Sequence, residues 1–487
     1  MSAVRDVDVV IVGTGFSGLC MAIQLKKEGT RSFVVLERAN DVGGTWRDNH
    51  YPGCACDVPS HLYSFSFEPN AKWSRTYAPQ PEILAYLRHC ADKYGVREHI
   101  RFESNVEHAE LDEARGLWRV FIEGGETIRA RHLVLGVGAL SRPSYPKLPG
   151  LERFEGKTFH SADWDHDFDL AGKTVAAIGT GASAIQFVPR IASQVKRLHL
   201  FQRTAPWVLP KADHAMAAGI QRLFDALPSA QRLYRRALWA ALEATSVGFV
   251  LEPEILRVAA VAGKRHIDRQ IKSPELRRAV TPKFKPGCKR ILLSNDYYSS
   301  LDQSHVEVVT TGIREVTKNG IVTADGSLRE VDAIIFGTGF RVTERPWPVD
   351  VRGRGGIDLN DAWSEGIEAY RGTTLAGFPN TYHLMGPNTG LGNNSMVFMI
   401  EAQVDYVLEC MRAMDRRGAR MADVLPSAQA AYNARLQARM DRSVWGTGCQ
   451  SWYLDEKGRN STLWPGFTTE FWLATRRMKA ADHEFEL

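Results

Sequence analysis

Residues 7–29 read VDVVIVGTGFSGLCMAIQLKKEG and carry the strongest structural signal in the first part of the chain. A run of β-branched residues ends at Gly13 and predicts a strand, and a helical pattern follows over about residues 17–28. Gly13, Gly15 and Gly18 fit the spacing G-x-G-x-x-G. The first glycine permits a tight turn, the second lets the backbone approach a pyrophosphate, and the third lets helix and strand pack closely. The stretch therefore predicts a dinucleotide site at a helix N-terminus, where free N–H groups favour an anion.

The following stretch, residues 32–37, reads SFVVLE and predicts a second strand that ends on Glu37. A carboxylate at this place accepts hydrogen bonds from ribose hydroxyls and repels a 2′-phosphate. Strand, helix, second strand and acid thus follow one another in the order that a βαβ unit requires. This first module is predicted to bind FAD or NAD.

A second module repeats the pattern over residues 173–204, KTVAAIGTGASAIQFVPRIASQVKRLHLFQRT. Gly179, Gly181 and Ala184 take the three small positions, and Arg203 stands as far after Ala184 as Glu37 stands after Gly18. An arginine can bind a 2′-phosphate through two hydrogen bonds and a full charge, and Thr204 adds a hydroxyl. The second module is therefore predicted to bind NADP rather than NAD, and two such modules in one chain indicate hydride transfer to a flavin.

Two further glycine-ended strands suggest how the modules are connected. Residues 131–140, RHLVLGVGAL, and 331–340, VDAIIFGTGF, would carry the chain out of the first domain and back into it. The predicted fold class is α/β, with two dinucleotide-binding Rossmann-like domains and a helical insertion. The helix-rich insertion could line a substrate tunnel or could only stabilise the domain. The expected divisions are an FAD domain in two parts, 1–140 and 337–487, and an NADP domain, 141–336, with its helical insert at about 210–285.

Composition excludes several classes of protein. The 487 residues are 44% hydrophobic and 24% charged, as in ordinary globular proteins, and the net charge of +5 is spread without an arginine-rich tract. No nucleic-acid partner is therefore expected. The seven cysteines and fourteen histidines show no C-x-x-C, H-E-x-x-H or clustered spacing. We expect no metal site and no disulfide framework, with most cysteines acting as small buried hydrophobes.

The chain shows no secretory or membrane-spanning pattern. Its first residues, MSAVRDVDVVIVG, lack the layout of a signal peptide. The nearest approach to a spanning segment, residues 237–251, is shorter than the ~20 apolar residues required and contains Glu243. The expected location is cytoplasmic, with interfacial membrane contact left open.

Two longer motifs resemble those of a known family. Residues 43–57, GGTWRDNHYPGCACD, fit small-G-x-W-x4-aromatic-P-G-x3-D, and residues 154–165, FEGKTFHSADWD, fit F-x-G-x3-H-x3-W-[P/D]. Both patterns resemble those of the type I Baeyer–Villiger monooxygenases, class B flavoprotein monooxygenases, and the likeness extends from Gly13 to residues 451–453. In that family the second motif lies between the FAD and NADP domains. Its members here are Phe154, Gly156, His160, Trp164 and Asp165, and their implied role is to order the linker.

The resemblance implies a reaction: NADPH- and O2-dependent conversion of ketones to esters or lactones through a C4a-peroxyflavin. The segment 284–298, FKPGCKRILLSNDYY, resembles the one that supplies a cation beside the peroxide, which places this role on Arg290. Asp57 is implied as the partner that positions Arg290. An arginine stays charged at any working pH, so it could hold a peroxide anion and then an alkoxide.

Candidate binding residues follow from the two glycine loops and from the resemblance. Trp452 in the C-terminal stretch 448–467 is a candidate substrate contact. Candidate FAD contacts are Gly13, Gly15, Phe16, Ser17, Gly18, Glu37, Arg38, Gly44, Thr45, Trp46, Asp57, Tyr63, Val106 and Met396. Candidate NADP contacts are Gly179, Thr180, Gly181, Ser183, Gln186, Arg203, Thr204 and Lys289.

Two other functions compete with ketone oxidation. One is an N- or S-oxygenating flavin-containing monooxygenase, which uses a protonated, electrophilic peroxide. The other is a flavin-bearing sensor without productive oxygenation. Arg290 favours an anionic peroxide and therefore ketone attack. The sequence leaves open which ketone is used, whether cyclic, linear, aromatic or steroid-like, and leaves the oligomeric state unknown.

Overall fold

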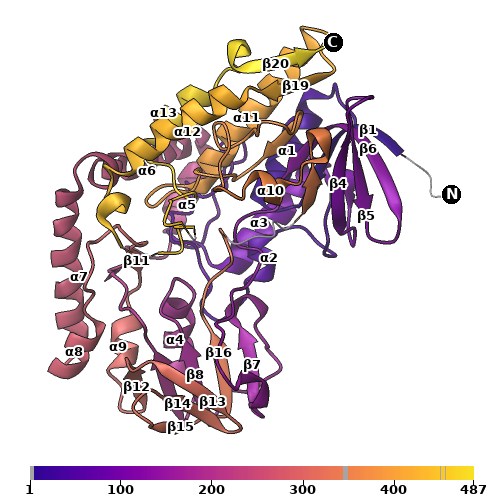
Figure 1. Cartoon of the computed structure of the whole chain (residues 1–487). Helices are drawn as coiled ribbons and strands as arrows, with labels where there is room; N and C mark the ends of the chain where they lie inside the picture. Colours follow the sequence, from indigo (N-terminus) through magenta and orange to yellow (C-terminus); the bar gives the residue numbers. More distant parts are fainter. Residues whose placement is uncertain (1–4, 344–348, 450, 456) are drawn as a thin grey trace.

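The computed structural model describes residues 5–343, 349–449, 451–455 and 457–487. Some predictions from the sequence include positions outside these described residues. They are residues 1–4, 344–348, 450 and 456, the last two of which belong to the stretch 448–467. Two sheets form the centres of two bodies (Figure 1), the larger sheet above and the smaller below. Helices α7 (Arg257–Gln270) and α8 (Pro274–Val280) run down one side of the molecule, from the level of the larger body towards that of the smaller one.

The larger sheet has the strand order β17-β4-β5-β6-β1-β2-β3, and β18 also pairs with β6. Parallel pairing joins β6, β1, β2 and β3, whereas β4, β5 and β6 form an antiparallel meander. Its strands are β1 (Arg5–Val12), β2 (Phe33–Leu36), β3 (Ile100–Arg101), β4 (Val106–Asp112), β5 (Leu117–Ile122), β6 (Glu126–Leu135), β17 (Asp350–Arg352) and β18 (Thr381–His383).

The largest core cluster forms around α1 (Phe16–Glu28), which is buried along most of its length between this sheet and α11 (Met396–Asp415). Apolar residues line almost every side of α1, as expected for a helix enclosed on both faces. The predicted βαβ unit is present, with the helix one residue longer at its start. Smaller helices on this body are α2 (Thr45–Asp48), α3 (Gln80–Lys93) and α10 (Leu359–Ala362).

The smaller sheet is entirely parallel and has the order β12-β9-β8-β16-β7. Its strands are β7 (Lys157–His160), β8 (Thr174–Ile178), β9 (Arg197–Phe201), β12 (Val306–Val309) and β16 (Ala333–Phe336). Helix α4 (Ala184–Ala192) connects β8 to β9, and α9 (Tyr297–Leu301) precedes β12. The second glycine loop thus lies between β8 and α4, a strand and the helix that follows it in a separate parallel sheet, as the sequence predicts. An antiparallel meander of β13 (Ile313–Thr317), β14 (Gly320–Thr323) and β15 (Leu328–Glu330) follows.

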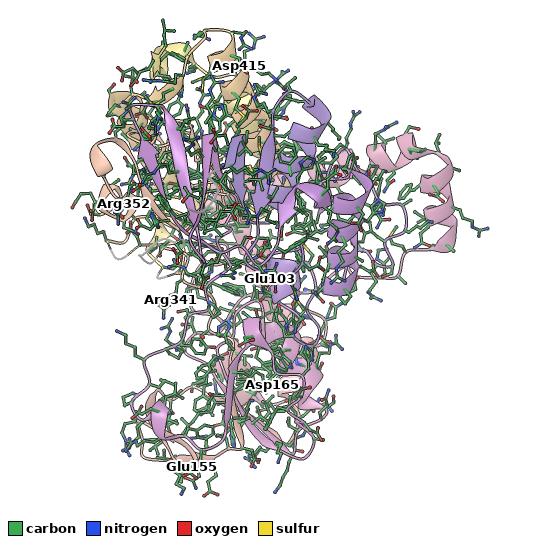
Figure 2. All side chains as sticks on the ribbon, turned by 90° about the vertical axis from the view of Figure 1, so that its right-hand side faces the viewer. Glu103, Glu155, Asp165, Arg341, Arg352 and Asp415 are labelled. Carbon is green, nitrogen blue, oxygen red and sulfur yellow. A yellow bond between two sulfur atoms is a disulfide. The ribbon has the colours of Figure 1, made fainter. Side chains whose placement is uncertain are left out.

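The chain passes twice between the two bodies, and the passages lie side by side. The Ser144 N–H donates to the Gly339 carbonyl at 2.9 Å, and the Arg341 N–H donates to the Arg142 carbonyl at 2.9 Å. Pro143 and Phe340 form an antiparallel bridge. Arg341 lies between the upper body and the lower body that holds Asp165 (Figure 2). The segments predicted to carry the chain out and back therefore run together as one two-stranded connection.

The predicted helical insertion contains four α-helices: α5 (Ala218–Ala226), α6 (Pro228–Ser246), α7 and α8. Glu243 on α6 is buried and accepts hydrogen bonds from Thr468 Oγ1 at 2.7 Å and Asn394 Nδ2 at 3.1 Å. Its carboxylate therefore joins the insertion to the C-terminal helices. In the described part of the chain, no helix combines the length and apolarity needed to cross a membrane.

The C-terminal region packs on the larger body beside the insertion (Figure 1). Helix α11 begins it, and α12 and α13 lie beside α6 in the figure. Strands β10 and β11 form a short parallel pair that brings the segment after Arg290 next to residue 208. The remaining elements are α12 (Pro426–Met440), α13 (Thr468–Thr475), β10 (Val208–Leu209), β11 (Leu292–Leu293), β19 (Met421–Val424) and β20 (His483–Glu486).

Candidate functional site

Asp57 and Arg290 meet between the two bodies although 233 residues separate them. Arg290 donates to Asp57 Oδ2 through Nε at 2.8 Å and through Nη2 at 2.6 Å. Its Nη1 donates to the Leu391 carbonyl at 3.3 Å. The two side chains remain 27% and 29% exposed, so the pair is partly open rather than sealed in a core. The pairing expected from the resemblance is therefore present.

The charge of Arg290 is stabilised by its surroundings. The carboxylate of Asp57 raises the pKa of the guanidinium, and this effect outweighs the opposing effect of burial. A partly buried cation without such a partner would carry an uncompensated desolvation cost. Arg290 therefore offers a permanent positive charge whose Nη groups are held in a fixed direction.

Three aromatic side chains predicted to line the flavin form one cluster near Asp57. The Phe16 and Tyr63 rings lie 5.1 Å apart, and the Trp46 and Tyr63 rings lie 5.6 Å apart, both edge to face. Trp46 Nε1 donates to the Tyr63 hydroxyl at 3.1 Å. Burial raises the pKa of Tyr63, and Asp57 contributes in the same direction, so this hydroxyl stays protonated. The cluster supplies a rigid apolar wall beside the charged pair.

The first glycine loop has the geometry that a pyrophosphate requires. Gly13 has φ of +96°, and a Cβ on Gly18 would lie 1.8 Å from the Gly13 carbonyl oxygen. A Cβ on Gly15, by contrast, would find its nearest atom 3.9 Å away, on Gly44. Helix α1 has no side-chain cap at its N-terminus. Tight packing on one side and free backbone N–H groups on the other fit a bound dinucleotide phosphate.

Glu37 at the end of β2 is buried, and neighbouring groups hold its carboxylate. Thr14 donates to Oε2 from its N–H at 3.0 Å and its hydroxyl at 2.6 Å, and Arg47 lies 3.1 Å from Oε1. The Ala39 N–H also donates to Oε1, at 3.0 Å. These contacts fix the position of the Glu37 carboxylate at the loop, where the sequence predicts ribose recognition. Sequence reasoning did not anticipate Thr14 and Arg47.

The remaining candidate FAD residues occupy several elements around this loop. Arg38 is exposed and lies 3.8 Å from Asp48. Val106 begins β4, and Met396 begins α11, whose N-terminus has no side-chain cap. Ser17 lies in the first turn of α1, and Gly44 and Thr45 lie at the start of α2.

The second glycine loop repeats these features. Gly179 has φ of +112°, a Cβ there would lie 2.3 Å from the Gly337 carbonyl oxygen, and Gly181 is open. Helix α4 begins after Ser183 without a side-chain cap. Thr180 Oγ1 donates to the Thr204 carbonyl at 2.9 Å and so fixes the loop against the end of β9.

Arg203 and Lys289 come close enough to affect each other. Burial lowers the pKa of Lys289, and the positive charge of Arg203 lowers it further. Both belong to the predicted NADP set, one from each end of the helical insertion. Two cations that repel each other at the edge of a glycine loop are suited to a doubly charged anion such as a phosphate.

The loop that follows α2 touches both bodies. Tyr51 donates to Gln186 Oε1 at 2.9 Å, and Gln186 Nε2 donates to the Ala55 carbonyl at 3.0 Å. His50 Nδ1 and His166 Nε2 lie 2.8 Å apart. The loop also lines a pocket of about 570 Å³ together with Gln186 and side chains of the second body. Gln186, a candidate NADP residue, therefore holds the two bodies together at this pocket.

The stretch 154–165 differs in part from its sequence interpretation as an interdomain linker. Residues 157–160 form β7, the outer strand of the smaller sheet, in parallel register with β16. The edge position explains why only Phe159 and His160 of this strand are buried. A Cβ on Gly156 would lie 2.5 Å from the Asp332 carbonyl oxygen, so the strand approaches the chain there too closely for a side chain.

The other members of this motif fix the turn after β7. His160 is fully buried, and its Nδ1 accepts from the Ala162 N–H at 3.0 Å. Trp164 packs edge to face on Phe159, with ring centroids 5.1 Å apart. Asp165 forms an ion pair with Lys157 at 2.5 Å, and Phe154 packs against the core on the other face of the sheet.

His160 also contacts the two passages between the bodies. Its ring lies 5.3 Å from that of Tyr145 and 5.9 Å from that of Phe340. Burial lowers its pKa to about 4, so the imidazole is neutral near pH 7. The predicted junction role is thus compatible with its position, although the motif belongs to the second sheet.

In the C-terminal stretch, Tyr453 lies next to Trp452, the predicted substrate contact. Trp452 is 49% exposed, whereas Tyr453 is 1% exposed. The Tyr453 side chain is buried beside Arg290, and burial raises the pKa of its hydroxyl to about 12. Sequence reasoning selected Trp452 and missed Tyr453. The aromatic pair in the order Trp-Tyr was visible, but its spacing does not tell which ring points inward.

The cysteines differ from the sequence expectation in one respect. Five are free and buried, as expected: Cys20, Cys54, Cys56, Cys90 and Cys410. Cys288 and Cys449, however, form a disulfide across 161 residues. No spacing rule could have paired them, since one precedes Lys289 and the other lies in the C-terminal loop.

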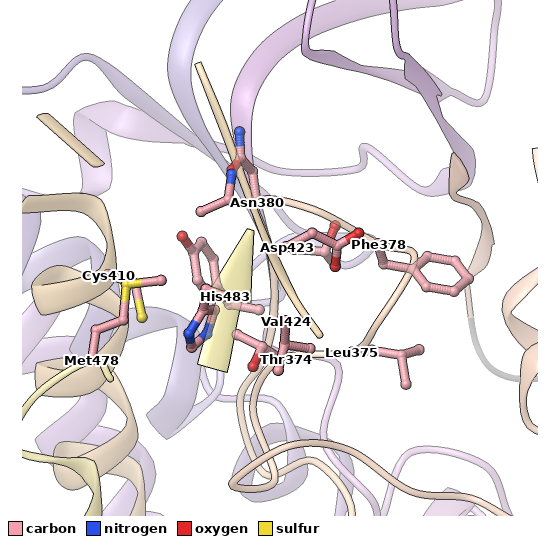
Figure 3. Close-up of a pocket in the computed structure, with 12 residues that line it drawn as sticks. Thr374, Leu375, Phe378, Asn380, Cys410, Asp423, Val424, Met478 and His483 are labelled. Carbon is pink, nitrogen blue, oxygen red and sulfur yellow. The ribbon is translucent and has the colours of Figure 1, made fainter. Parts of the chain in front are cut away.

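Other features of the structure are less suited to binding a ligand. Among the residues that the structure describes, no three His, Cys, Asp or Glu side chains are grouped for a metal ion. A second cavity lies near β19 and β20, where Asp423 and His483 contribute to its wall (Figure 3). Its volume of about 10 Å³ is enough for about one water molecule, so it cannot hold a ketone or a nucleotide.

The chain is similar to characterised flavoproteins over nearly its whole length. Residues 6–219 match the flavin-binding monooxygenase-like family. A Baeyer–Villiger monooxygenase of Pseudomonas aeruginosa is 53% identical, covering 99% of this chain and 92% of its own. One of Streptomyces coelicolor is 50% identical, covering 99% and 93%.

Solved structures agree with these relatives. A cyclohexanone-bound cyclohexanone monooxygenase has a TM-score of 0.87 and 28% identity, with 100% of both chains covered. A crystal structure of OTEMO in complex with FAD and NADP has a TM-score of 0.89 and 27% identity, covering 98% of this chain and 99% of its own. The fold and the paired glycine loops define a two-nucleotide flavoprotein monooxygenase. The chain belongs to the Baeyer–Villiger monooxygenases.

Proposed function

We propose that Asp57 and Arg290 form the catalytic pair of this Baeyer–Villiger monooxygenase. The enzyme uses FAD, NADPH and dioxygen to convert a ketone into an ester or lactone. When bound, FAD supplies the oxygen activation and NADPH supplies the electrons. The observation that carries the proposal is the two-point contact of Arg290 with Asp57 between the nucleotide loops, with both side chains partly exposed.

Arg290 stabilises negative charge on the reacting groups. Asp57 holds the guanidinium through Nε and one Nη, which leaves other N–H groups to bind the oxygen of the ketone as that oxygen gains charge. A donor that is already oriented requires no reorganisation during the reaction. Tyr453 adds to this order because its side chain is buried beside Arg290.

The two glycine loops are assigned to the two nucleotides. Tight turns, uncapped helix N-termini and open Gly15 and Gly181 support a dinucleotide at each loop. Glu37 beside the first loop and Arg203 beside the second support FAD at the first and NADP at the second. Arg203, Thr204 and Lys289 are assigned to the 2′-phosphate. We assign the other predicted FAD contacts to FAD and the other predicted NADP contacts to NADP. Trp452 is proposed to contact the substrate from the exposed rim of the site.

The domain divisions follow the same assignment. We place the FAD domain in residues 1–140 and 337–487 and the NADP domain in residues 141–336. Support comes from the paired passages near residues 142 and 341 and from the membership of the two sheets. The motif at 154–165 orders this junction through His160. NADPH is produced in the cytoplasm, and we place the enzyme there.

The test replaces Arg290 by alanine and by lysine in the FAD-loaded enzyme. We expect NADPH to bleach the flavin absorbance without oxygen in both variants. Ester formation from cyclohexanone should fall by about 10²–10³ in the alanine variant, as for other stabilisers of developing charge. Arg129→Ala is the matched control, since Arg129 forms a two-point pair with Asp6 far from the site. Ester formation within tenfold of wild type in Arg290→Ala would contradict the role. Oxidation of amines or sulfides, without ester, would favour the heteroatom class.

A further inference from the structure

The disulfide connects the catalytic segment to the C-terminal loop. Cys288 is 2% exposed and directly precedes Lys289 and Arg290 in the chain. Cys449 lies shortly before Trp452 and Tyr453, and the two cysteine Cα atoms are 6.2 Å apart. One covalent bond therefore joins the backbone that carries the catalytic cation to the backbone that carries the candidate substrate contact.

Noncovalent contacts anchor the far end of this loop, where the Asn388 N–H donates to the Ser461 carbonyl at 2.8 Å and the Gly390 N–H donates to the Thr462 carbonyl at 2.9 Å. They hold the start of the loop only in part. Tyr453 is buried against Arg290, and the Thr343 hydroxyl contacts the Leu454 carbonyl at 3.4 Å, a long hydrogen bond. Trp452 is exposed and contributes little to anchoring. The start of the loop, next to Gly448 with φ of +86°, is fixed to Arg290 mainly by the disulfide.

A shared apolar cluster shows what the bond stabilises. Cys288 packs in a cluster with Phe249 from the insertion, Leu391 from the loop before α11, and Trp445 and Tyr453 from the C-terminal region. Leu391 is also the residue whose carbonyl accepts from Arg290. Three separate segments thus converge where the disulfide lies, next to the proposed catalytic group.

We propose that Cys288 and Cys449 form a redox-responsive site, in which the disulfide holds the C-terminal loop closed over Arg290 and the dithiol releases it. The proposed link to catalysis rests on the function assigned to Arg290. The existence of the bond and its control of the loop do not.

The oxidant that fits this site is a hydroperoxide. Cys288 and Cys449 together lose two electrons and two protons as the S–S bond forms, and one molecule of hydrogen peroxide takes these up to give two molecules of water. A flavoprotein monooxygenase releases hydrogen peroxide when NADPH and oxygen react without transfer of an oxygen atom to substrate. A small dithiol reverses the step by thiol–disulfide exchange. Peroxide from unproductive turnover would therefore close the loop and favour productive turnover.

The five remaining cysteines provide internal controls. Burial raises the pKa of Cys54, Cys90 and Cys410 to about 12, which keeps these thiols protonated and slow to react. Cys449 is only partly buried, whereas all five of these cysteines are buried, so peroxide at moderate concentration should act on the Cys288–Cys449 pair before it acts on them.

The first experiment counts thiols in the holoenzyme. The protein is treated with hydrogen peroxide, with dithiothreitol or with neither, then denatured, alkylated with iodoacetamide and analysed by mass spectrometry. We expect five alkylated cysteines after peroxide and seven after dithiothreitol, with residues 288 and 449 accounting for the difference. Seven alkylated cysteines after peroxide would overturn the proposal.

The second experiment follows the loop and the reaction in the same samples. Hydrogen exchange in residues 451–455 should accelerate at least tenfold after reduction of the wild type, and should be fast in both states of Cys449→Ser. The KM for cyclohexanone should rise, and ester formed per NADPH should fall, by about two- to fivefold on reduction. Cys410→Ala should respond as the wild type does.

The outcomes of these experiments distinguish the redox-responsive site from the proposed catalytic function of Arg290. Unchanged exchange, or unchanged KM and ester yield, between oxidised and reduced wild type would overturn the redox-responsive site. Absence of ester in every state would instead overturn the proposed function, while thiol counting and exchange still decide whether the bond controls the loop. Cys288→Ser provides a second route if Cys449→Ser does not fold.

Discussion

Replacing Arg203 by alanine should weaken the use of NADPH and spare the use of NADH. Arg203 is exposed at the end of β9, and its charge contributes to the lowered pKa of Lys289. The unliganded site therefore contains two cations that repel each other. A 2′-phosphate relieves this repulsion, and NADH, which lacks that phosphate, does not.

The size of the effect follows from the exposure of the side chain. Hydrogen bonds to charged groups contribute about 1.5–3 kcal/mol each. Because Arg203 is exposed to solvent, the lower part of this range applies, about 1.5–2 kcal/mol. Each 1.4 kcal/mol is a factor of about ten, so the KM for NADPH should rise roughly 10- to 30-fold. The KM for NADH should change by less than about twofold.

The assay is the initial rate of ketone-dependent coenzyme oxidation over a range of NADPH and NADH concentrations. Arg197→Ala is the matched control, because Arg197 is an exposed arginine at the other end of the same strand. The NADPH preference of the wild type should also decline as salt is added, since the contact is exposed. Equal increases in the two KM values for Arg203→Ala would refute the assignment of this residue to the 2′-phosphate.

Two further predictions concern glycine packing and pH. Gly18→Ala places a Cβ 1.8 Å from the Gly13 carbonyl oxygen and should reduce flavin bound per protein at least tenfold by absorbance, whereas Gly219→Ala, which meets open space, should retain it. His160 has its pKa lowered to about 4, from an unfolded value near 6.5, so its neutral form stabilises the fold fully above about pH 6.5. As the pH falls from about 6.5 to 4, the free energy of unfolding of the wild type should decrease by about 3 kcal/mol more than that of His160→Gln, as measured by denaturant titration. Parallel pH profiles of the two proteins would show that His160 is not protonated on unfolding.

The sequence was sufficient for the two nucleotide modules because their signals are local. Glycines, strands and terminal residues of each βαβ unit lie within about 30 residues, and the turn at Gly13 and the close packing at Gly18 are set by that short stretch. The Asp57–Arg290 contact joins residues 233 positions apart and was reached only through the family resemblance.

The structure differs from the sequence predictions where packing between distant parts of the chain determines the conformation. Residues 157–160 form an edge strand with only two buried side chains, too few for a period-two pattern to be visible. Tyr453 and Trp452 are adjacent aromatics, and only packing against Arg290 determines which one is buried. The Cys288–Cys449 pair has no spacing signal at all, since disulfide pairing depends on proximity in the folded chain.

The adjacent passages near residues 142 and 341 have a consequence for protein engineering. Because the two ends of the intervening segment hydrogen-bond to each other, the backbone enters and leaves that segment at one place. A segment with neighbouring ends can be exchanged as a cassette between homologous genes without altering the distance that either junction must span. Recombination at this point would transfer the second glycine loop and Arg203 as a unit. The two parents must share the side chains that join this unit to the rest of the chain: Gln186 and His166 at the loop after α2, Glu243 with Thr468, and the Cys288–Cys449 disulfide.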